Sequence, residues 1–301
     1  MGNFIKRLKT KRAIAIAASM LILGAIAVVL LGSATATPLC TTGSGPGVTS
    51  VCVEVLMPDG SPVTCGSTVD TGELIARGFA TGTNAAQNVT WRMSYFANGS
   101  GGGDWYTLYL ARLNTVQTKM AELVQDFSAA QANSSVSFAF AQKAGLNTPR
   151  CDVFLGDVSS IPGEISERTV QTTALIALSV ELRNYADGTP FPCGGVAPGG
   201  RIAGKLFATA PSAGLYDMHM HEERPLPLGT GPNQDQMFSD QRWWEMAMFR
   251  VPVGTSSTKV VDFVSQLNGS QGGGMSTVHW GQQALDLSPN VQPFTMCHFD
   301  T

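Results

Sequence analysis

Short runs in which apolar and polar residues alternate, separated by Gly, Asn and Pro turns, are the feature that most constrains the fold of this chain. Between residues 51 and 110 these runs cover 51–57, 73–80, 89–96 and 105–110. Successive side chains of a strand point to opposite faces, so alternation predicts strands with one buried face. Strands repeated at this spacing predict an antiparallel sheet, as in a β-sandwich.

Two later segments have a different period and predict helices. Residues 115–132 carry apolar side chains three and four positions apart, and residues 166–185 are more apolar still. Between them, residues 136–140 and 153–155 predict further strands. The expected fold class is therefore α+β and β-rich, an antiparallel sheet or sandwich with about two helices.

The N-terminus differs in composition from the rest of the chain. Five basic residues precede an apolar run at 13–31, and Ala34-Thr35-Ala36 follows as a small-residue cleavage site. Residues 1–36 thus predict a signal peptide, or an N-terminal membrane anchor if they are retained. We expect a spacer at 37–50, a β-sheet module at 51–112 and a mixed α/β module at 113–301, with no evident internal repeat.

The chain contains six cysteines, all of them beyond the predicted leader: Cys40, Cys52, Cys65, Cys151, Cys193 and Cys297. An even number in an exported chain predicts up to three disulfides. Local spacing favours a disulfide between Cys52 and Cys65. A second disulfide between Cys151 and Cys193 is compatible with the spacing, and the remaining pair would then be Cys40 and Cys297. No C-x-x-C pair is present, so a thiolate zinc site has no support.

The charge balance excludes one class of partner. Beyond residue 36 the chain keeps 14 Lys and Arg against 22 Asp and Glu, a net charge of about −8. An acidic body without basic clusters argues against nucleic-acid binding. Contact with a membrane is expected only through residues 13–31, if the leader is retained.

The strongest candidate site lies at Tyr216-Asp217-Met218-His219-Met220-His221. A period of two places Asp217, His219 and His221 on one strand face, where they predict a site for zinc or another divalent transition metal. Among the four histidines of the chain, His279 is a further candidate ligand and His298 is another. Glu223 is the candidate general base on metal-bound water. The alternative is that these histidines are hydrogen-bonded residues of a partly buried strand.

Three resemblances bear on this region and on the N-terminal strands. Residues 214–252 resemble the uncharacterised YukJ-like bacterial family in Asp217-Met218-His219-Met220, then Phe238, Asp240 and a Trp-led strand, which implies a compact mixed α/β or β-rich domain. The H-x-H pair also looks like the opening strand of the amidohydrolases, but the 80 residues after His221 are too few for their barrel. Residues 51–110 resemble immunoglobulin-like modules of bacterial surface proteins in strand pattern.

The sequence therefore predicts an exported cell-surface or envelope protein with a binding or structural role, whose N-terminal sheet contacts a protein or glycan. The alternative is a metal-dependent hydrolase that uses Asp217, His219 and His221. No nucleophile elbow, P-loop or dinucleotide-binding glycine motif is present to support another chemistry.

Overall fold

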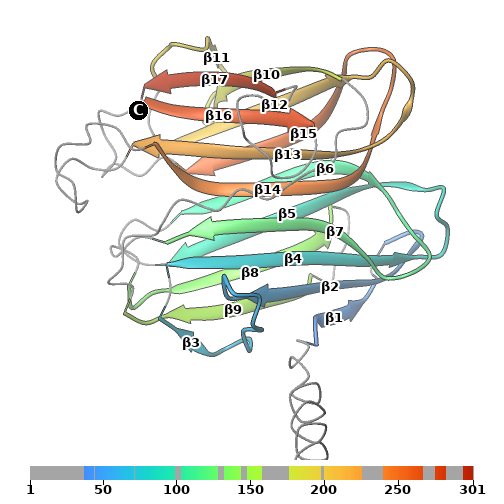
Figure 1. The fold of residues 1–301 in the computed structure, drawn as a ribbon, viewed down its shortest axis with the longest axis vertical. Coiled ribbons are helices and arrows are strands. Elements are labelled where there is room, and N and C mark those ends of the chain that lie inside the picture. Colours follow the sequence, from blue (N-terminus) through green and yellow to red (C-terminus); the bar gives the residue numbers. More distant parts are fainter. Residues whose placement is uncertain are drawn as a thin grey trace, which may run out of the picture. The chain divides into compact units, whose positions relative to one another are not determined.

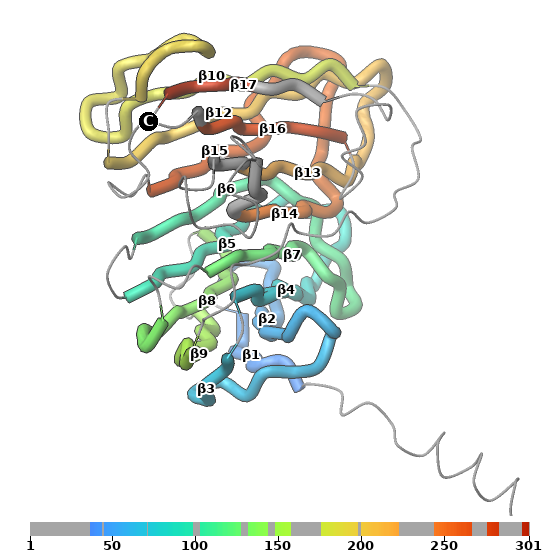
Figure 2. Tube along the Cα trace, turned by 60° about the vertical axis from the view of Figure 1, so that its left-hand side comes forward, coloured from blue at the N-terminus to red at the C-terminus, as the bar shows by residue number. Residues whose placement is uncertain are grey.

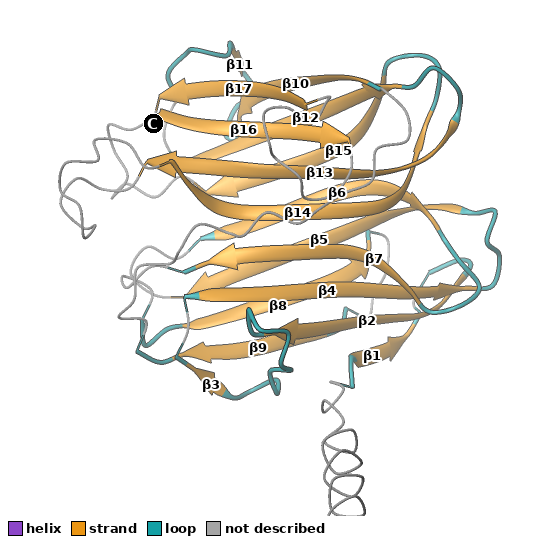
Figure 3. Cartoon of the chain, viewed as in Figure 1, coloured by secondary structure: helices purple, strands orange, loops and turns teal. Residues whose placement is uncertain are grey.

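Strands are the only regular secondary structure in the part of the chain that the structure describes (Figure 3). This computed structural model describes residues 37–43, 45–70, 72–98, 103–127, 132–143, 148–157, 176–197, 200–225, 240–266, 275–282 and 294–300. The predicted leader, residues 1–36, lies outside these ranges. Within them no helix is long and apolar enough to cross a membrane. The described fold is all-β, so the predicted α+β class is wrong.

The strands form two mainly antiparallel sheets, called sheet A and sheet B (Figure 1). Sheet A has the order β1 (Leu39–Thr42), β2 (Val48–Leu56), β4 (Glu73–Gly82), β7 (Thr118–Asp126), β14 (Asp240–Val253), β13 (Gly214–Pro225), β16 (Met275–Gln282) and β17 (Phe294–Asp300). Sheet B has the order β11 (Pro190–Phe191), β10 (Ala177–Asn184), β12 (Arg201–Thr209), β15 (Thr258–Gln266), β6 (Asp104–Arg112), β5 (Asn88–Asn98), β8 (Ser135–Gln142), β9 (Arg150–Leu155) and β3 (Thr68–Val69).

The predicted helices are strands wherever the structure describes them. Thr118–Asp126 of the first segment is β7, and Ala177–Asn184 of the second is β10, while residues 158–175 lie outside the described part. Strand β7 is buried on both faces, from Met120 to Asp126. A strand covered on both sides has no reason to alternate, so its apolar residues matched a helical spacing by chance.

The two sheets bury their facing sides against each other in one apolar core. Close approach is clearest at Gly78 of β4, where a Cβ atom would lie 2.3 Å from the ring of Phe140 on β8. Phe140 in turn stacks on Trp91 of β5, with ring centroids 5.2 Å apart. Glycine at position 78 therefore lets an aromatic ring of sheet B rest directly on the backbone of sheet A.

The fold contains an internal repeat. In residues 48–155, here the N-half, β2-β4-β7 lie in sheet A and β6-β5-β8-β9 in sheet B. In residues 177–300, the C-half, β10-β12-β15 lie in sheet B and β14-β13-β16-β17 in sheet A. Strand order and pairing are the same, with the sheets exchanged. Both sheets thus run from blue-green N-half strands into yellow-red C-half strands (Figure 2).

A sequence motif accompanies the repeat and contradicts the expectation that there is none. The pattern D-G-[ST]-P-x-x-C-G occurs at residues 59–66 and again at 187–194. In each copy the Asp side chain accepts a hydrogen bond from the backbone N–H of the residue two positions later. Ser61 N donates to Asp59 Oδ1 (2.8 Å), and Thr189 N donates to Asp187 Oδ1 (2.9 Å). The Ser61 and Thr189 hydrogen bonds lower the pKa of Asp59 and Asp187, respectively.

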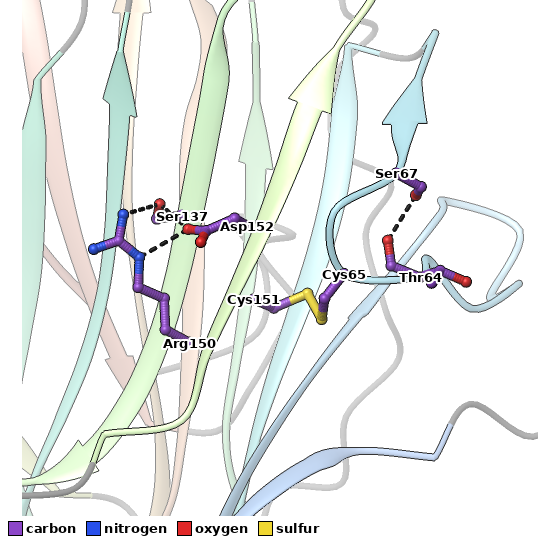
Figure 4. Close-up of a disulfide and its surroundings, with 7 residues drawn as sticks. All are labelled: Thr64, Cys65, Ser67, Ser137, Arg150, Cys151 and Asp152. Carbon is purple, nitrogen blue, oxygen red and sulfur yellow. Dashed lines mark hydrogen bonds and ion pairs between the residues drawn. A yellow bond between two sulfur atoms is a disulfide. The ribbon is translucent and has the colours of Figure 1, made fainter.

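The disulfides follow the same repeat and correct the predicted pairing. The bonded pairs are Cys40–Cys52, Cys65–Cys151 and Cys193–Cys297. Cys65–Cys151 and Cys193–Cys297 each link a copy of the motif to the last strand of its own half, β9 or β17. We call these two links the disulfide joints, and Figure 4 shows the one at Cys65–Cys151. At both joints the glycine after the cysteine donates a backbone hydrogen bond to that last strand. Gly66 N donates to Asp152 O and Gly194 N donates to His298 O, each over 2.6 Å. Spacing along the sequence misled the prediction because the partner strands are distant in the chain.

Two equivalent seams join the halves, β7 with β14 in sheet A and β15 with β6 in sheet B. Between them lie the equivalent residues Trp105 and Trp244, both buried, with ring centroids 4.9 Å apart. They differ in one contact. Trp244 Nε1 donates 2.9 Å to the buried Glu222 Oε2, whereas Trp105 Nε1 has no hydrogen-bond partner among the described residues.

We expect Trp244→Phe to destabilise the protein by about 1–3 kcal/mol more than Trp105→Phe. Both substitutions remove a similar apolar volume from one place in the core, but only the first takes a donor from a buried carboxylate. Chemical denaturation of the two variants measures the difference in the free energy of unfolding. Equal losses would show that the Glu222 contact contributes nothing.

We expect Cys65→Ser/Cys151→Ser and Cys193→Ser/Cys297→Ser to have similar costs of about 4–5 kcal/mol, and Cys40→Ser/Cys52→Ser to cost about 3 kcal/mol. The first two bonds close loops of 86 and 104 residues, while the third closes one of 12. Denaturant unfolding of the three double variants tests the order. A larger loss for the Cys40–Cys52 pair would contradict it.

Candidate functional site

All four histidines of the chain lie on three neighbouring strands of sheet A, namely β13, β16 and β17. On β13, Glu222 faces sheet B, where Ser265 of β15 donates 2.6 Å to its Oε2. Met218 and Met220 share this inward face because strand side chains alternate. His219 and His221 therefore belong to the outer face of sheet A, as the sequence pattern predicted.

The outer face brings together His219, His221, His279 and Glu245, here called the histidine cluster. His221 is directly opposite His279 on β16 and opposite Glu245 on β14. The rings of His221 and His279 stack with centroids 4.0 Å apart, and those of His219 and His221 are 5.2 Å apart. His219 Nε2 lies 3.6 Å from Glu245 Oε1. His219, His221 and Glu245 are all nearly inaccessible to solvent.

The cluster does not have the geometry of a shared metal site. The lone pair of an imidazole nitrogen lies in the ring plane, and the planes of His221 and His279 are within 16° of parallel. Lone pairs that lie in two nearly parallel planes do not point at one common position, whereas zinc requires its ligands to converge at about 2.0–2.1 Å. Within the described residues no three His, Cys, Asp or Glu side chains are arranged to hold a metal ion. The arrangement instead combines stacked imidazoles with a carboxylate.

Asp217, a predicted ligand, lies apart from the cluster and has a local structural role. The pairing of β13 with β14 shifts register between Tyr216 and Met218. At this bulge Arg250 adopts a φ of 61°, and its backbone N donates 2.9 Å to Asp217 Oδ1. Asp217 therefore stabilises the bulged backbone of the neighbouring strand β14, where Arg250 has a positive φ.

The remaining predicted residues are His298 and Glu223. His298 is on β17, where its Nδ1 lies 2.8 Å from Thr277 Oγ1. Glu223 pairs with Thr277 through the backbone of β13, but its side chain is outside the described part. The sequence analysis missed Glu245, although an acidic residue within the apolar run 243–252 is a signal for a buried polar contact.

The N-half shows which of these residues the fold requires. Trp91 and Met218 both lie opposite a glutamine at the end of the next strand, Gln142 and Gln282, which equates the two registers. His219, His221, His279 and Glu245 then correspond to Arg92, Ser94, Ala139 and Tyr106. The same strand pairing forms without histidines, so the cluster is an addition to the C-half and not a condition of its folding.

Comparison with known proteins gives no family for the chain. No protein-family model matches it, and no curated protein is similar to it. The resemblance to the YukJ-like family therefore stays a prediction. Among solved structures, "BspA_C_mut" shares 9% identity over 83% of this chain and 98% of that chain, with a TM-score of 0.26. The C-terminal domain of the Streptococcus pyogenes antigen I/II-family protein AspA shares 10% over 83% and 99%, with a TM-score of 0.24. Red sea bream transglutaminase shares 8% over 83% and 31%, with a TM-score of 0.21. Similarity at this level does not establish a common fold.

We expect the purified protein to retain less than stoichiometric zinc after incubation with the ion and dialysis, because stacked rings do not present convergent ligands. Elemental analysis of the wild-type protein and of His219→Ala/His221→Ala measures this. One zinc per chain that the double variant loses would contradict the geometric argument and would support a metal-dependent hydrolase.

Proposed function

We propose that this protein is an exported cell-surface or envelope protein with a binding or structural role. The observation that carries the proposal is the disulfide set. All six cysteines are paired, and no described cysteine is free. Disulfides form and persist in oxidising compartments and are rare in the cytosol. Two of these bonds close loops of 86 and 104 residues, so they are built into the tertiary fold.

The leader supports export from an independent direction. Basic residues followed by an apolar run and Ala34-Thr35-Ala36 are typical of an export signal or an N-terminal anchor. Every cysteine follows this segment. The chain thus combines a predicted route out of the cytoplasm with a fold that needs oxidising conditions.

A binding or structural role fits the repeat. The two halves share their core and their disulfide joints, while the side chains on their outer faces differ, as His219 and Arg92 illustrate. A rigid scaffold whose surface varies without change in the fold is suited to presenting binding groups. The partner is a protein or glycan outside the cytoplasm. The hydrolase alternative rests on the histidine cluster alone and is tested by the zinc measurement.

Export is tested by expressing the full chain and a matched variant without residues 1–36 in the same bacterial host. We expect the full chain outside the cytoplasm, with its cysteines unreactive towards maleimide until it is reduced. The truncated chain should stay in the cytoplasm with reactive thiols, because its disulfides cannot form there. Peptide mapping without reduction should recover the three bonded pairs.

A full-length chain that stays in the cytoplasm, folds and carries reactive thiols would overturn the proposal. The truncated variant controls for oxidation during lysis, since any pairing introduced then would occur in both chains.

A further inference from the structure

Arginine and aromatic side chains gather on the outer face of sheet B, on the opposite side of the sandwich core from sheet A. Residue pairs across neighbouring strands place them together: Ser94 with Tyr106, Phe96 with Asp104, and Arg201 with Gln266. We call this set the arginine–aromatic face. Its members are Arg92, Phe96, Asp104, Tyr106, Tyr185, Arg201 and Gln266.

Arg201 holds one side of this face in place. Its Nε donates 2.9 Å to Gln266 Oε1, its guanidinium pairs with Asp104, and it lies over the Tyr185 ring, 5.5 Å from the centroid. Burial, followed by the neighbouring Tyr185, raises the pKa of Tyr106. Arg201 thus brings the Tyr185 ring, Asp104 and Gln266 together on one side of the face.

Arg92 differs from three of the four other arginines of sheet B, and it is more exposed than the fourth, Arg112 of β6, which has no ion pair to a described residue either. Arg92 is exposed and lies over the Tyr106 ring, 4.8 Å from the centroid, but it forms no ion pair with any described residue. By contrast, Arg150 is paired with Asp152, Arg183 with Glu181 and Arg201 with Asp104. An arginine that lies over a ring and has no ion pair can offer its N–H donors to a carboxylate, which a guanidinium binds with two hydrogen bonds.

Two other aromatic residues of the arginine–aromatic face remain accessible. Phe96 and Tyr185 each expose 43% of their surface, on a sheet whose other large apolar residues are mostly buried. The strand pairing does not require Arg92 or Tyr106, because the C-half has His219 at the position of Arg92 and Glu245 at the position of Tyr106. In a chain whose body carries a net charge of about −8, an exposed arginine without an ion pair to a described residue is available to an acidic group.

We propose that the arginine–aromatic face binds an acidic carbohydrate. The inference rests on the proposed function, since it gives the exported binding protein a class of ligand. Arg92 takes the sugar carboxylate, and the exposed ring faces pack on the C–H face of the pyranose, to which the negative face of an aromatic ring is complementary. Asp104 and Gln266 supply polar atoms for hydroxyl groups.

The place of this face in the sheet favours a sugar over a peptide. Extended peptides usually bind sheets by adding a strand at an open edge. Strands β5, β6 and β15 are interior strands, paired on both sides, so their backbone groups are already used in the ladder. Recognition here must come from side chains on a flat surface, which suits a ring-shaped ligand with one charge.

Binding is tested by calorimetry on the full mature protein with two acidic probes, 3′-sialyllactose and an oligogalacturonate, and with neutral lactose and an oligogalactan as their matched controls. We expect at least one acidic probe to bind at least tenfold more tightly than its neutral control. Arg92→Ala should weaken that binding at least tenfold, and Arg92→Lys should restore only part of it because lysine lacks the two-pronged donor geometry.

Arg150→Ala is the matched control variant, because it removes the same charge from the same sheet at a residue already paired with Asp152. It should bind as the wild type does, and circular dichroism should show all variants folded. Equal weakening by Arg92→Ala and Arg150→Ala, or binding that neither changes, would overturn the assignment to this face. Tighter binding of a hexaglutamate peptide would identify an acidic peptide as the partner and refute the carbohydrate. Binding of no acidic probe would refute the inference and leave the export result, measured separately, intact.

Discussion

Burial of two apolar sheet faces against each other is the constraint on which the rest of this structure depends. A sheet that is hydrophobic on one side must cover that side, and here the facing sides of the two sheets cover each other in one core. Each sheet contains strands of both halves, because β7 pairs with β14 and β15 pairs with β6. The apolar core is therefore continuous from one half to the other. The contact of Trp105 with Trp244 lies where the two halves meet, so the core has no boundary between them. The fold is thus one sandwich assembled from two copies of a single arrangement.

The same constraint leaves the outer faces free to differ. The side chains that face the other sheet must be apolar and closely packed, as the contact of Gly78 with Phe140 shows. The side chains on the outer faces are not under this constraint, because the backbone alone makes the hydrogen bonds between strands. Corresponding positions can then carry Arg92 in one half and His219 in the other. What the halves keep in common marks the architecture, including the D-G-[ST]-P-x-x-C-G turns and their disulfides. What they do not share marks candidate function, and on this ground both the histidine cluster and the arginine–aromatic face stand apart from the scaffold.

Alternating runs located several strands correctly, whereas two strands, β7 and β10, were taken for helices. The runs at 89–96 and 105–110 became β5 and β6 with small changes at their ends. The run that became β7 is buried on both faces and was taken for a helix. The candidate site divided in a similar way. The alternation on β13 correctly placed His219 and His221 on one face, but Asp217 accepts a hydrogen bond from Arg250 N at a bulge of β14 that no pattern in the sequence indicates.

By itself, the sequence determined that the chain is rich in strands, that it carries an export-type leader and cysteines suited to an oxidising compartment, and that two histidines share a strand face. These properties depend on local alternation and composition. The tertiary structure alone decided the disulfide partners, the repeat with exchanged sheets, the approach of Glu245 and His279 to His221, and the meeting of Arg201 with Tyr185 and Asp104. The physical reason is that cross-strand neighbours are set by the order of strands in a sheet, and that order joins segments far apart in the chain.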